Sequence, residues 1–314
     1  MKSITRLILV VFLVFSFIVA EINAKKEPVQ QGKKESTHES HQVKELTADW
    51  DYTLRLDSKH FALFTTSPTS VAESIPKFAE NVYESFCNEF GDTGMMIPKK
   101  LKIYLFNKKK EYIRYMESKG MTVDKTWEPT PLYSSYSDAV LLLRQGQSRG
   151  YLLQSMAHEI THSLSVSLFK SLYNSGAWVI EGIAYYVGMS VKLKKKRIAL
   201  GEIHQTWKSQ IMGIIKEMFR QKKFIPLRKF INMRETALKR INFHLQAFSL
   251  FHFLQEVEDS KYKIGFHRYL GEICTGRGGG AEVFEECVGK ISEIEPACLK
   301  YIRRLKPNTR LSIR

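Results

Sequence analysis

The order in which apolar residues recur along the chain predicts strands and helices near the start, followed by a mostly helical region. Two short runs rich in aromatic and aliphatic side chains flank a polar turn, and they predict a β-hairpin of residues 52–56 and 61–65. Between Val71 and Phe86 the apolar residues recur at spacings of three and four, which predicts an amphipathic helix that ends near Gly91.

Three further elements precede the helical region. Residues 101–106 alternate between apolar and polar positions and predict a half-buried strand, residues 109–116 predict a short helix, and residues 137–143 predict another strand. Beyond Trp178 the pattern is helical nearly to the end of the chain. We therefore expect an α+β fold with a small mixed sheet and a mostly α-helical C-terminal half.

The first 47 residues differ from the rest. Residues 7–20 are uniformly apolar, follow two basic residues and are closed by Ala24, which predicts a signal peptide over residues 1–24. This run is shorter than the roughly 18–20 residues that span a bilayer, so an uncleaved membrane anchor is the less favoured alternative. Residues 25–47 contain no aromatic side chain and predict a disordered linker. We expect a secreted or periplasmic protein with no transmembrane segment after signal cleavage.

Composition and charge narrow the possible partners. A hydrophobic content of 44% excludes a wholly disordered chain, and 48 Lys and Arg against 32 Asp and Glu give a formal net charge of +16. The run 191–197 is strongly basic. A solvated surface is the plainer interpretation of such a run. Because the run has no interleaved aromatic residues that could stack on bases, it favours an anionic envelope surface over nucleic acid as a partner.

One predicted helix carries a motif with metal-binding chemistry. Residues 158–162 have the sequence His-Glu-Ile-Thr-His. Side chains four residues apart project from the same side of a helix, so the imidazoles of His158 and His162 can converge on one ion. Glu159 lies about 100° around the helix axis, where it can reach a water on the metal. A catalytic zinc centre normally has a third protein ligand and one open position.

Glu181 is the candidate third ligand. It stands in the otherwise apolar helical run 178–186, and charged residues seldom enter such runs without a partner. The 18 residues between His162 and Glu181 can finish one helix, turn near residues 174–176 and return beside it. Tyr185 follows Glu181 by four residues on the same helical face, where it either braces that ligand or packs.

These residues predict a hydrolase that uses Zn²⁺. Zinc held by two neutral imidazoles and one carboxylate keeps a net positive charge, so its bound water loses a proton readily. Glu159 would act as the general base and then deliver the proton to the leaving nitrogen of a peptide or protein substrate. We expect the strand 139–143 to hold the peptide by edge pairing.

The two segments resemble a known family. His-Glu-Ile-Thr-His at 158–162 and Trp-Val-Ile-Glu-Gly-Ile-Ala-Tyr-Tyr at 178–186 resemble the gluzincin metallopeptidases, whose pattern is H-E-x-x-H followed by W-x-x-E-G-x-A-x-Y. More closely, the mature chain is similar to secreted bacterial proteins with a peptidase-MA-like domain. That similarity covers residues 61–106, the zinc segment and the helical stretch 243–254.

The resemblance implies a domain organisation and a set of roles. Residues 48–190 would form a zincin-like catalytic core, and residues 191–314 a helical region that completes the cleft. The implied zinc ligands are His158, His162 and Glu181. The implied catalytic carboxylate is Glu159.

The chain also departs from the family pattern. Aminopeptidases of this superfamily carry an Asn before the ligand Glu and a Gly-x-Met-Glu-Asn segment, whereas Ile180 occupies the first place here and the second has no counterpart. These departures favour endopeptidase action. Closer relatives usually carry a Tyr where His244 stands. His244 either donates to a transition-state oxygen or faces solvent or a backbone carbonyl.

Two alternative functions remain open at this point. The chain could instead be a basic secreted binding protein for anionic envelope polymers with a structural or inactive zinc site, or a zinc hydrolase of non-peptide amides or esters.

Export permits disulfides, and among Cys87, Cys274, Cys287 and Cys298 we expect one bridge within the last three. A zinc site made by these thiols is not expected, because no C-x-x-C spacing occurs.

Overall fold

The structure is a computed structural model of the chain, and it describes residues 49–91, 99–121, 130–134, 138–168, 176–192, 197–203, 205–233 and 241–305. The expected signal peptide (1–24) and linker (25–47) lie outside these ranges. Within them, no helix combines the length and the apolar character that crossing a membrane requires.

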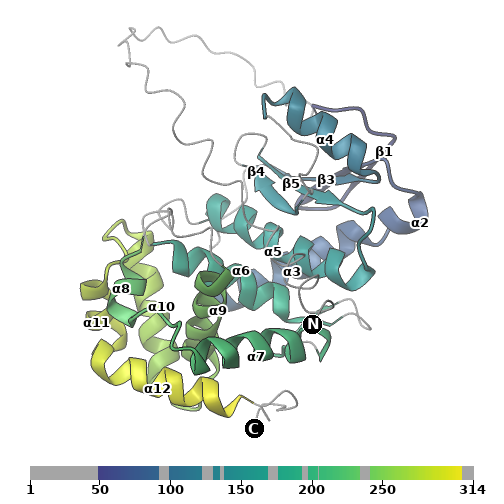
Figure 1. Cartoon of the computed structure of the whole chain (residues 1–314). Helices are drawn as coiled ribbons and strands as arrows, with labels where there is room; N and C mark the ends of the chain where they lie inside the picture. The colour runs from purple at the N-terminus through teal and green to yellow at the C-terminus, as the bar shows by residue number, and fades with distance from the viewer. Residues whose placement is uncertain are drawn as a thin grey trace, which may run out of the picture.

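A five-stranded mixed sheet forms one end of the molecule (Figure 1). Its strands, in spatial order, are β1 (Leu54–Asp57), β2 (Phe61–Thr65), β3 (Leu101–Phe106), β5 (Ala139–Leu143) and β4 (Leu132–Ser134). The strands β2, β3 and β5 are parallel, whereas β1 and β4 pair antiparallel at the two edges. The predicted hairpin and the strand at 101–106 are confirmed.

The expectation that residues 139–143 form an edge strand is wrong. β5 pairs with β3 on one side and with β4 on the other, so β4 occupies the edge. β4 has only three residues. A period of two does not show in so short a segment, which is why the pattern along the chain did not reveal this strand.

Both faces of the sheet are covered. The helices α3 (Ile75–Phe90) and α5 (Arg149–Leu168) pack on one face. The short helix α2 (Thr69–Ala72) precedes α3 in the chain. The other face lies against α4 (Lys109–Ser118) and the aromatic rings of Trp50 and Tyr52. Burial on both faces explains why all five residues of β5 are apolar and buried. The predicted helix end near Gly91 and the helix at 109–116 are confirmed.

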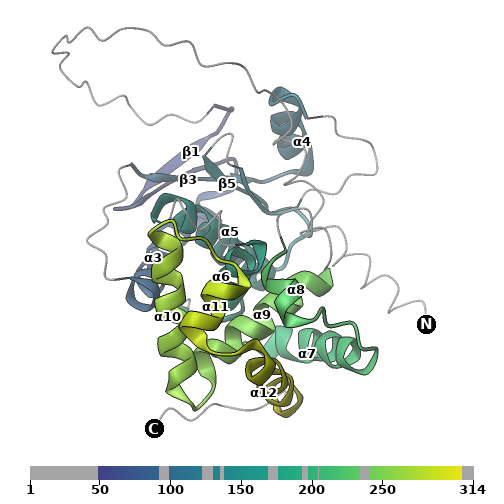
Figure 2. The ribbon, with the colours of Figure 1, turned by 90° about the vertical axis from the view of Figure 1, so that its left-hand side faces the viewer.

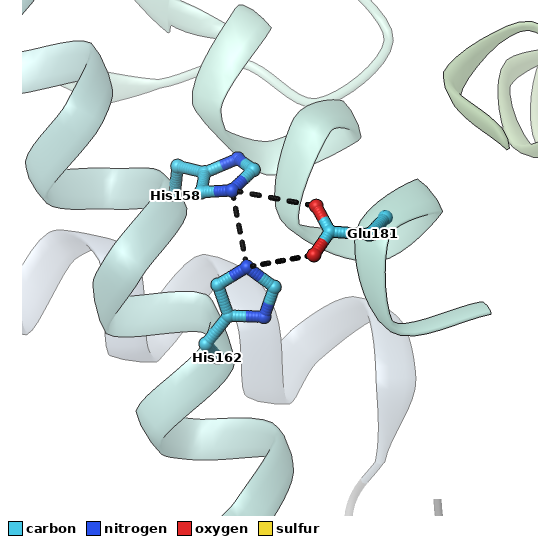
Figure 3. Close-up of side chains that lie close together, drawn as sticks. All are labelled: His158, His162 and Glu181. Atoms are coloured by element: carbon cyan, nitrogen blue, oxygen red, sulfur yellow. Dashed lines mark hydrogen bonds and ion pairs between the residues drawn. The ribbon is translucent and has the colours of Figure 1, made fainter. Parts of the chain in front are cut away.

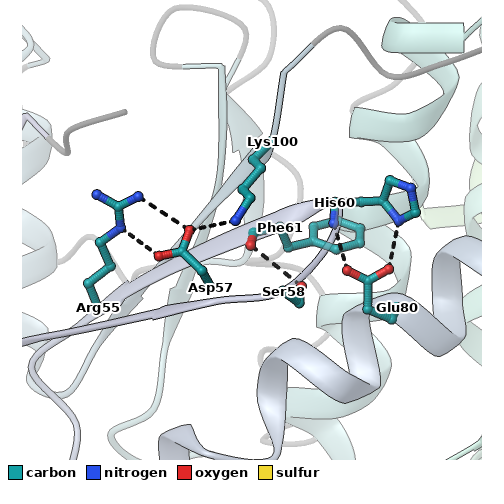
Figure 4. A network of polar contacts seen from close by, with 7 residues as sticks. All are labelled: Arg55, Asp57, Ser58, His60, Phe61, Glu80 and Lys100. Atoms are coloured by element: carbon teal, nitrogen blue, oxygen red, sulfur yellow. Dashed lines mark hydrogen bonds and ion pairs between the residues drawn. The ribbon is translucent and has the colours of Figure 1, made fainter. Parts of the chain in front are cut away.

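A carboxylate of α3 anchors the turn of the β1–β2 hairpin (Figure 4). Glu80 accepts a hydrogen bond from the His60 backbone N–H at 2.7 Å, and its second oxygen lies 2.7 Å from His60 Nδ1. Burial raises the pKa of Glu80, but these hydrogen bonds outweigh it and leave the pKa below its ordinary value. The hairpin is therefore fixed against α3, and the sheet keeps a set position over the helices.

The rest of the chain is almost entirely helical, as expected, with one small hairpin. Its elements are α6 (Ala177–Met189), β6 (Val191–Lys192), β7 (Arg197–Ile198), α7 (Gln205–Arg220), α8 (Leu227–Ile231), α9 (Ile241–Glu256), α10 (Ser260–Cys274), α11 (Ala281–Val288) and α12 (Ile291–Arg304). Helices α6 and α9 are buried nearly all round and pack against each other. In Figures 1 and 2 the sheet lies at the top and α7 and α12 at the bottom.

The architecture is α+β, with a mixed sheet and a mostly helical C-terminal half. Buried side chains from both halves join in one apolar core. The division into 48–190 and 191–314 stays a prediction.

The expected disulfide is not formed. None of the four cysteines is in a disulfide bond. Cys274, Cys287 and Cys298 lie on three different helices, α10, α11 and α12. Burial raises the pKa of the Cys298 thiol, so this residue acts as a small apolar core side chain.

Candidate metal centre

The two histidines of the motif lie on α5, as predicted, and point to the same place (Figure 3). Their Nε2 atoms are 3.0 Å apart, with the rings edge to face at 4.7 Å between centroids. Two imidazole nitrogens this close cannot both carry a proton toward each other. At most one of them donates to the other, and a bound cation would take a lone pair from each.

Glu181 enters this site from α6, the next helix along the chain. Its Oε1 lies 3.6 Å from His162 Nε2 and its Oε2 lies 3.7 Å from His158 Nε2. Two glycines let α6 approach its neighbours closely. A Cβ at Gly188 would lie 3.3 Å from the Cβ of His158, and a Cβ at Gly182 would lie 3.0 Å from the Phe251 ring of α9.

The distances and the unsatisfied polar atoms fit a bound cation. Within the described ranges, His158, His162 and Glu181 form the one group of three or more metal-ligating side chains that could hold a metal ion. Two atoms bound to one zinc ion at about 2.0–2.1 Å are at most about 4.2 Å apart, and the three measured separations satisfy this limit. The Glu181 Oε2 atom is buried and accepts no hydrogen bond, so a cation would supply its missing partner.

The electrostatics of the site point the same way. Burial lowers the pKa of His158 far below its ordinary value and that of His162 to about 4, so both rings are neutral at pH 7. Burial and the nearby Glu159 raise the pKa of Glu181 well above its ordinary value. Two buried carboxyl groups beside two neutral imidazoles would be stabilised by a bound cation.

Glu159 lies beside the ligand group and is held by the sheet. Its side chain is buried, and its Oε2 accepts a hydrogen bond of 2.8 Å from the backbone N–H of Tyr133 on the edge strand β4. Burial raises the pKa of Glu159 to about 8, and the Tyr133 N–H acts against this rise. Tyr133 also donates its hydroxyl to Asp138 Oδ1 at 2.9 Å, which ties β4 to the start of β5.

Tyr133 is a site residue that the sequence did not reveal. The interaction uses a backbone amide, which every residue except proline possesses. No side-chain pattern could have identified it.

His244 and Tyr185 both reach the site. His244, on α9, is fully buried, with its Nε2 3.7 Å from Glu181 Oε2. The alternative in which His244 faces solvent is therefore wrong. The Tyr185 ring lies edge to face against His158 at 4.7 Å between centroids, so it packs on a ligand ring from the side of α6.

The sequence has no match among known protein families or curated proteins.

Proposed function

We propose that the chain is an exported zinc metallopeptidase of the gluzincin type with a zincin-like core. The observation that carries this proposal is the convergence of two imidazole nitrogens from α5, 3.0 Å apart, with both oxygens of Glu181 from α6. Two histidines and one glutamate form a ligand set found in zinc peptidases. The resemblance of segments 158–162 and 178–186 to that family also supports it.

Bound zinc supplies Lewis acidity, which lowers the pKa of a coordinated water and polarises a carbonyl group. The residues of this chain prepare the site for that chemistry. His158 and His162 are neutral because they are buried, so their lone pairs are available to the ion. The Tyr133 amide holds Glu159 Oε2, which leaves Oε1 to accept a proton from the attacking water and to return it to the leaving nitrogen.

The peptide substrate would bind along β4 rather than β5. β4 is the edge strand, and Glu159 is hydrogen-bonded to its middle residue, Tyr133. An extended peptide beside this edge would therefore pass close to the metal ligands, while the Tyr133 N–H stays donated to Glu159. Binding along an edge strand needs no free chain terminus, which agrees with endopeptidase action.

Metal analysis and turnover by one pair of variants test the proposal. We expect purified protein to hold about one zinc per chain and to cleave an unfolded protein substrate. Glu159→Gln should keep the zinc and lose about 10²–10⁴-fold in turnover, because general acid–base catalysis is removed. The matched control is Glu117→Gln on the exposed side of α4, which should change neither property.

Two results would contradict the proposal. Full turnover by Glu159→Gln would remove this residue from the mechanism. Zinc binding by the wild-type protein without any hydrolysis would instead indicate a structural or inactive site.

A further inference from the structure

Positive charge gathers at the end of the molecule opposite the sheet. The exposed cations of this basic end come from the C-terminal part of α7 with the turn after it, and from the C-terminal part of α12; they are Lys216, Arg220, Lys222, Lys223, Lys300, Arg303 and Arg304. In the views of Figures 1 and 2 both helices lie at the bottom, away from the sheet.

The two groups of cations form one surface. The Arg303 guanidinium carbon of α12 lies 4.1 Å from the centre of the Phe219 ring of α7. This cation–π contact joins the ends of the two helices. Cations in a last helical turn also complement the helix dipole. The dipole does not explain Lys222 and Lys223, because they follow the end of α7.

The cations of the basic end have few acidic neighbours. Among the described residues only Arg220 has a carboxylate partner, Glu217, and the other six cations make no ion pair. Several cations at the sheet end are paired instead with aspartates; these pairs are Arg55–Asp57, Lys99–Asp138, Lys100–Asp57 and Lys119–Asp49. Six unpaired exposed cations on the ends of two adjoining helices therefore make the basic end a surface of positive potential.

The basic run identified in the sequence is a different place. Within the run 191–197, Lys192 is paired with Glu202 at 2.6 Å, and residues 193–196 lie outside the described ranges. Lys192 is therefore neutralised by a carboxylate.

We propose that the basic end docks on a membrane surface rich in anionic phospholipids. Clustered exposed Lys and Arg side chains are sufficient for such binding, since the lipid phosphates form a continuous anionic plane. Nucleic acid is favoured less, because Phe219 is covered by Arg303 and packs against Phe224, so its ring is not available for stacking on a base. Docking at this end leaves the sheet and its edge strand facing away from the lipid.

Vesicle co-sedimentation of the full chain tests the proposal. The vesicles are phosphatidylcholine alone or phosphatidylcholine with about 30% phosphatidylglycerol. The test protein carries Lys216→Glu, Lys223→Glu and Arg304→Glu. The matched control carries Lys59→Glu, Lys77→Glu and Lys110→Glu, which are exposed and lie on the hairpin turn, α3 and α4. Both variants change the net charge equally, and both keep the apolar segment 7–20.

We expect the wild type and the control to bind the anionic vesicles with similar affinity, and the test protein to bind at least about tenfold more weakly. A version with Gln at the same three positions should show a smaller loss. Raising the salt from about 0.05 M to about 0.5 M should release the wild type, whereas inorganic phosphate at matched ionic strength should have no additional effect.

Three results would overturn the proposal. Equal losses of vesicle affinity in the test and control proteins would mean that binding depends on net charge and not on the basic end. Equal binding to the two vesicle types would assign binding to apolar contacts. Tighter binding to a single-stranded oligonucleotide than to anionic vesicles, lost in the test protein, would make nucleic acid the partner.

Discussion

Helices α6 and α9 carry one buried and one partly buried polar cluster, and the two differ in how their polar atoms are satisfied. The first is the metal cluster, formed by Glu181 of α6 and His244 of α9 with the two histidines of α5. The second, here called the Glu256 network, lies further along both helices and consists of Tyr186, His252, Glu256 and Tyr301 with the backbone of Gly201.

The Glu256 network is satisfied by the protein itself. The Tyr186 hydroxyl donates to Glu256 Oε1, the Tyr301 hydroxyl lies 2.8 Å from His252 Nδ1, and His252 Nε2 lies 3.2 Å from the Gly201 carbonyl oxygen. Gly201 adopts a φ of +77°, and a Cβ there would lie 2.4 Å from the Glu256 carboxyl carbon. The backbone therefore closes tightly over this carboxylate.

In the metal cluster the imidazole nitrogens face each other, and Glu181 Oε2 accepts no hydrogen bond. The comparison teaches that burial and charge alone do not distinguish a structural cluster from a binding site. What distinguishes them is whether the protein supplies the partners of the buried polar atoms or leaves them for a ligand.

The largest expected effect is on metal binding. We expect His158→Ala to weaken zinc binding by more than about 100-fold, because losing a ligand costs more than the 10–100-fold that losing an outer partner costs. His252→Ala should keep full zinc affinity while lowering stability. Isothermal titration with zinc measures the zinc affinity of both variants. Loss of zinc binding in His252→Ala would contradict the distinction between the two clusters.

The stability of the metal-free protein separates the buried carboxyl group of Glu181 from the partly buried one of Glu256. In chelator, we expect Tyr186→Phe to lower the free energy of unfolding by about 1.5–3 kcal/mol, because Glu256 loses a hydrogen bond. Glu181→Gln should cost less than about 1 kcal/mol, since it removes a buried carboxyl group whose Oε2 accepts no hydrogen bond. Urea unfolding gives both values. A large loss for Glu181→Gln in chelator would show that Glu181 is structural.

Added zinc should reverse the order of stability of the two variants. At a free zinc concentration about 100 times the Kd, the wild type should gain about 2.7 kcal/mol, and Tyr186→Phe should gain as much. Glu181→Gln should gain little. An equal gain in all three proteins would place the ion elsewhere.

The hydrogen bond from the Tyr133 N–H of β4 to Glu159 predicts a smaller effect on catalysis. Tyr133→Pro removes the N–H that Glu159 accepts, and proline is tolerated on an edge strand where that N–H does not serve the sheet. We expect kcat to fall about tenfold, the equivalent of one hydrogen bond, with zinc content unchanged. Tyr133→Phe keeps the N–H and loses only the hydroxyl bond to Asp138. An equal fall in kcat for both variants would refute a role for the amide.

A further effect concerns the pH dependence of the stability of the metal-free protein. Burial raises the pKa of Glu159 from 4.5 to about 8, so between these values the folded state holds a proton that the unfolded chain has released. Stability should therefore decrease as pH rises through this window, by up to about 1.4 kcal/mol per pH unit. Glu159→Gln lacks this titration. If its stability relative to the wild type did not change with pH, the carboxyl would not be perturbed.

The sequence predicted the parts of the site that depend on side-chain type and local geometry. A separation of four residues on a helix is enough to place His158 and His162 together. A single charge in an apolar helical run was enough to indicate that Glu181 lies at a polar site, and the structure places it beside the two histidines. The helix is a local structure with a fixed period, so both inferences needed no knowledge of the tertiary fold.

Other features depended on contacts that only the fold creates. The three-residue strand β4 is too short for a pattern and gains its place by pairing with β5. Glu256 is the last residue of α9, a position that is usually solvated, and its burial depends on Gly201 and Tyr186. The burial of His244 likewise depends on how α9 packs against α6.

X-ray absorption at the zinc edge of the zinc-loaded protein tests the central claim most directly. We expect scattering from two imidazoles and a carboxylate oxygen at about 2.0–2.2 Å, with one position left for solvent, and an unchanged spectrum in His244→Ala. Three imidazoles in the wild type, falling to two in His244→Ala, would mean a closed site without a catalytic position and would contradict the account.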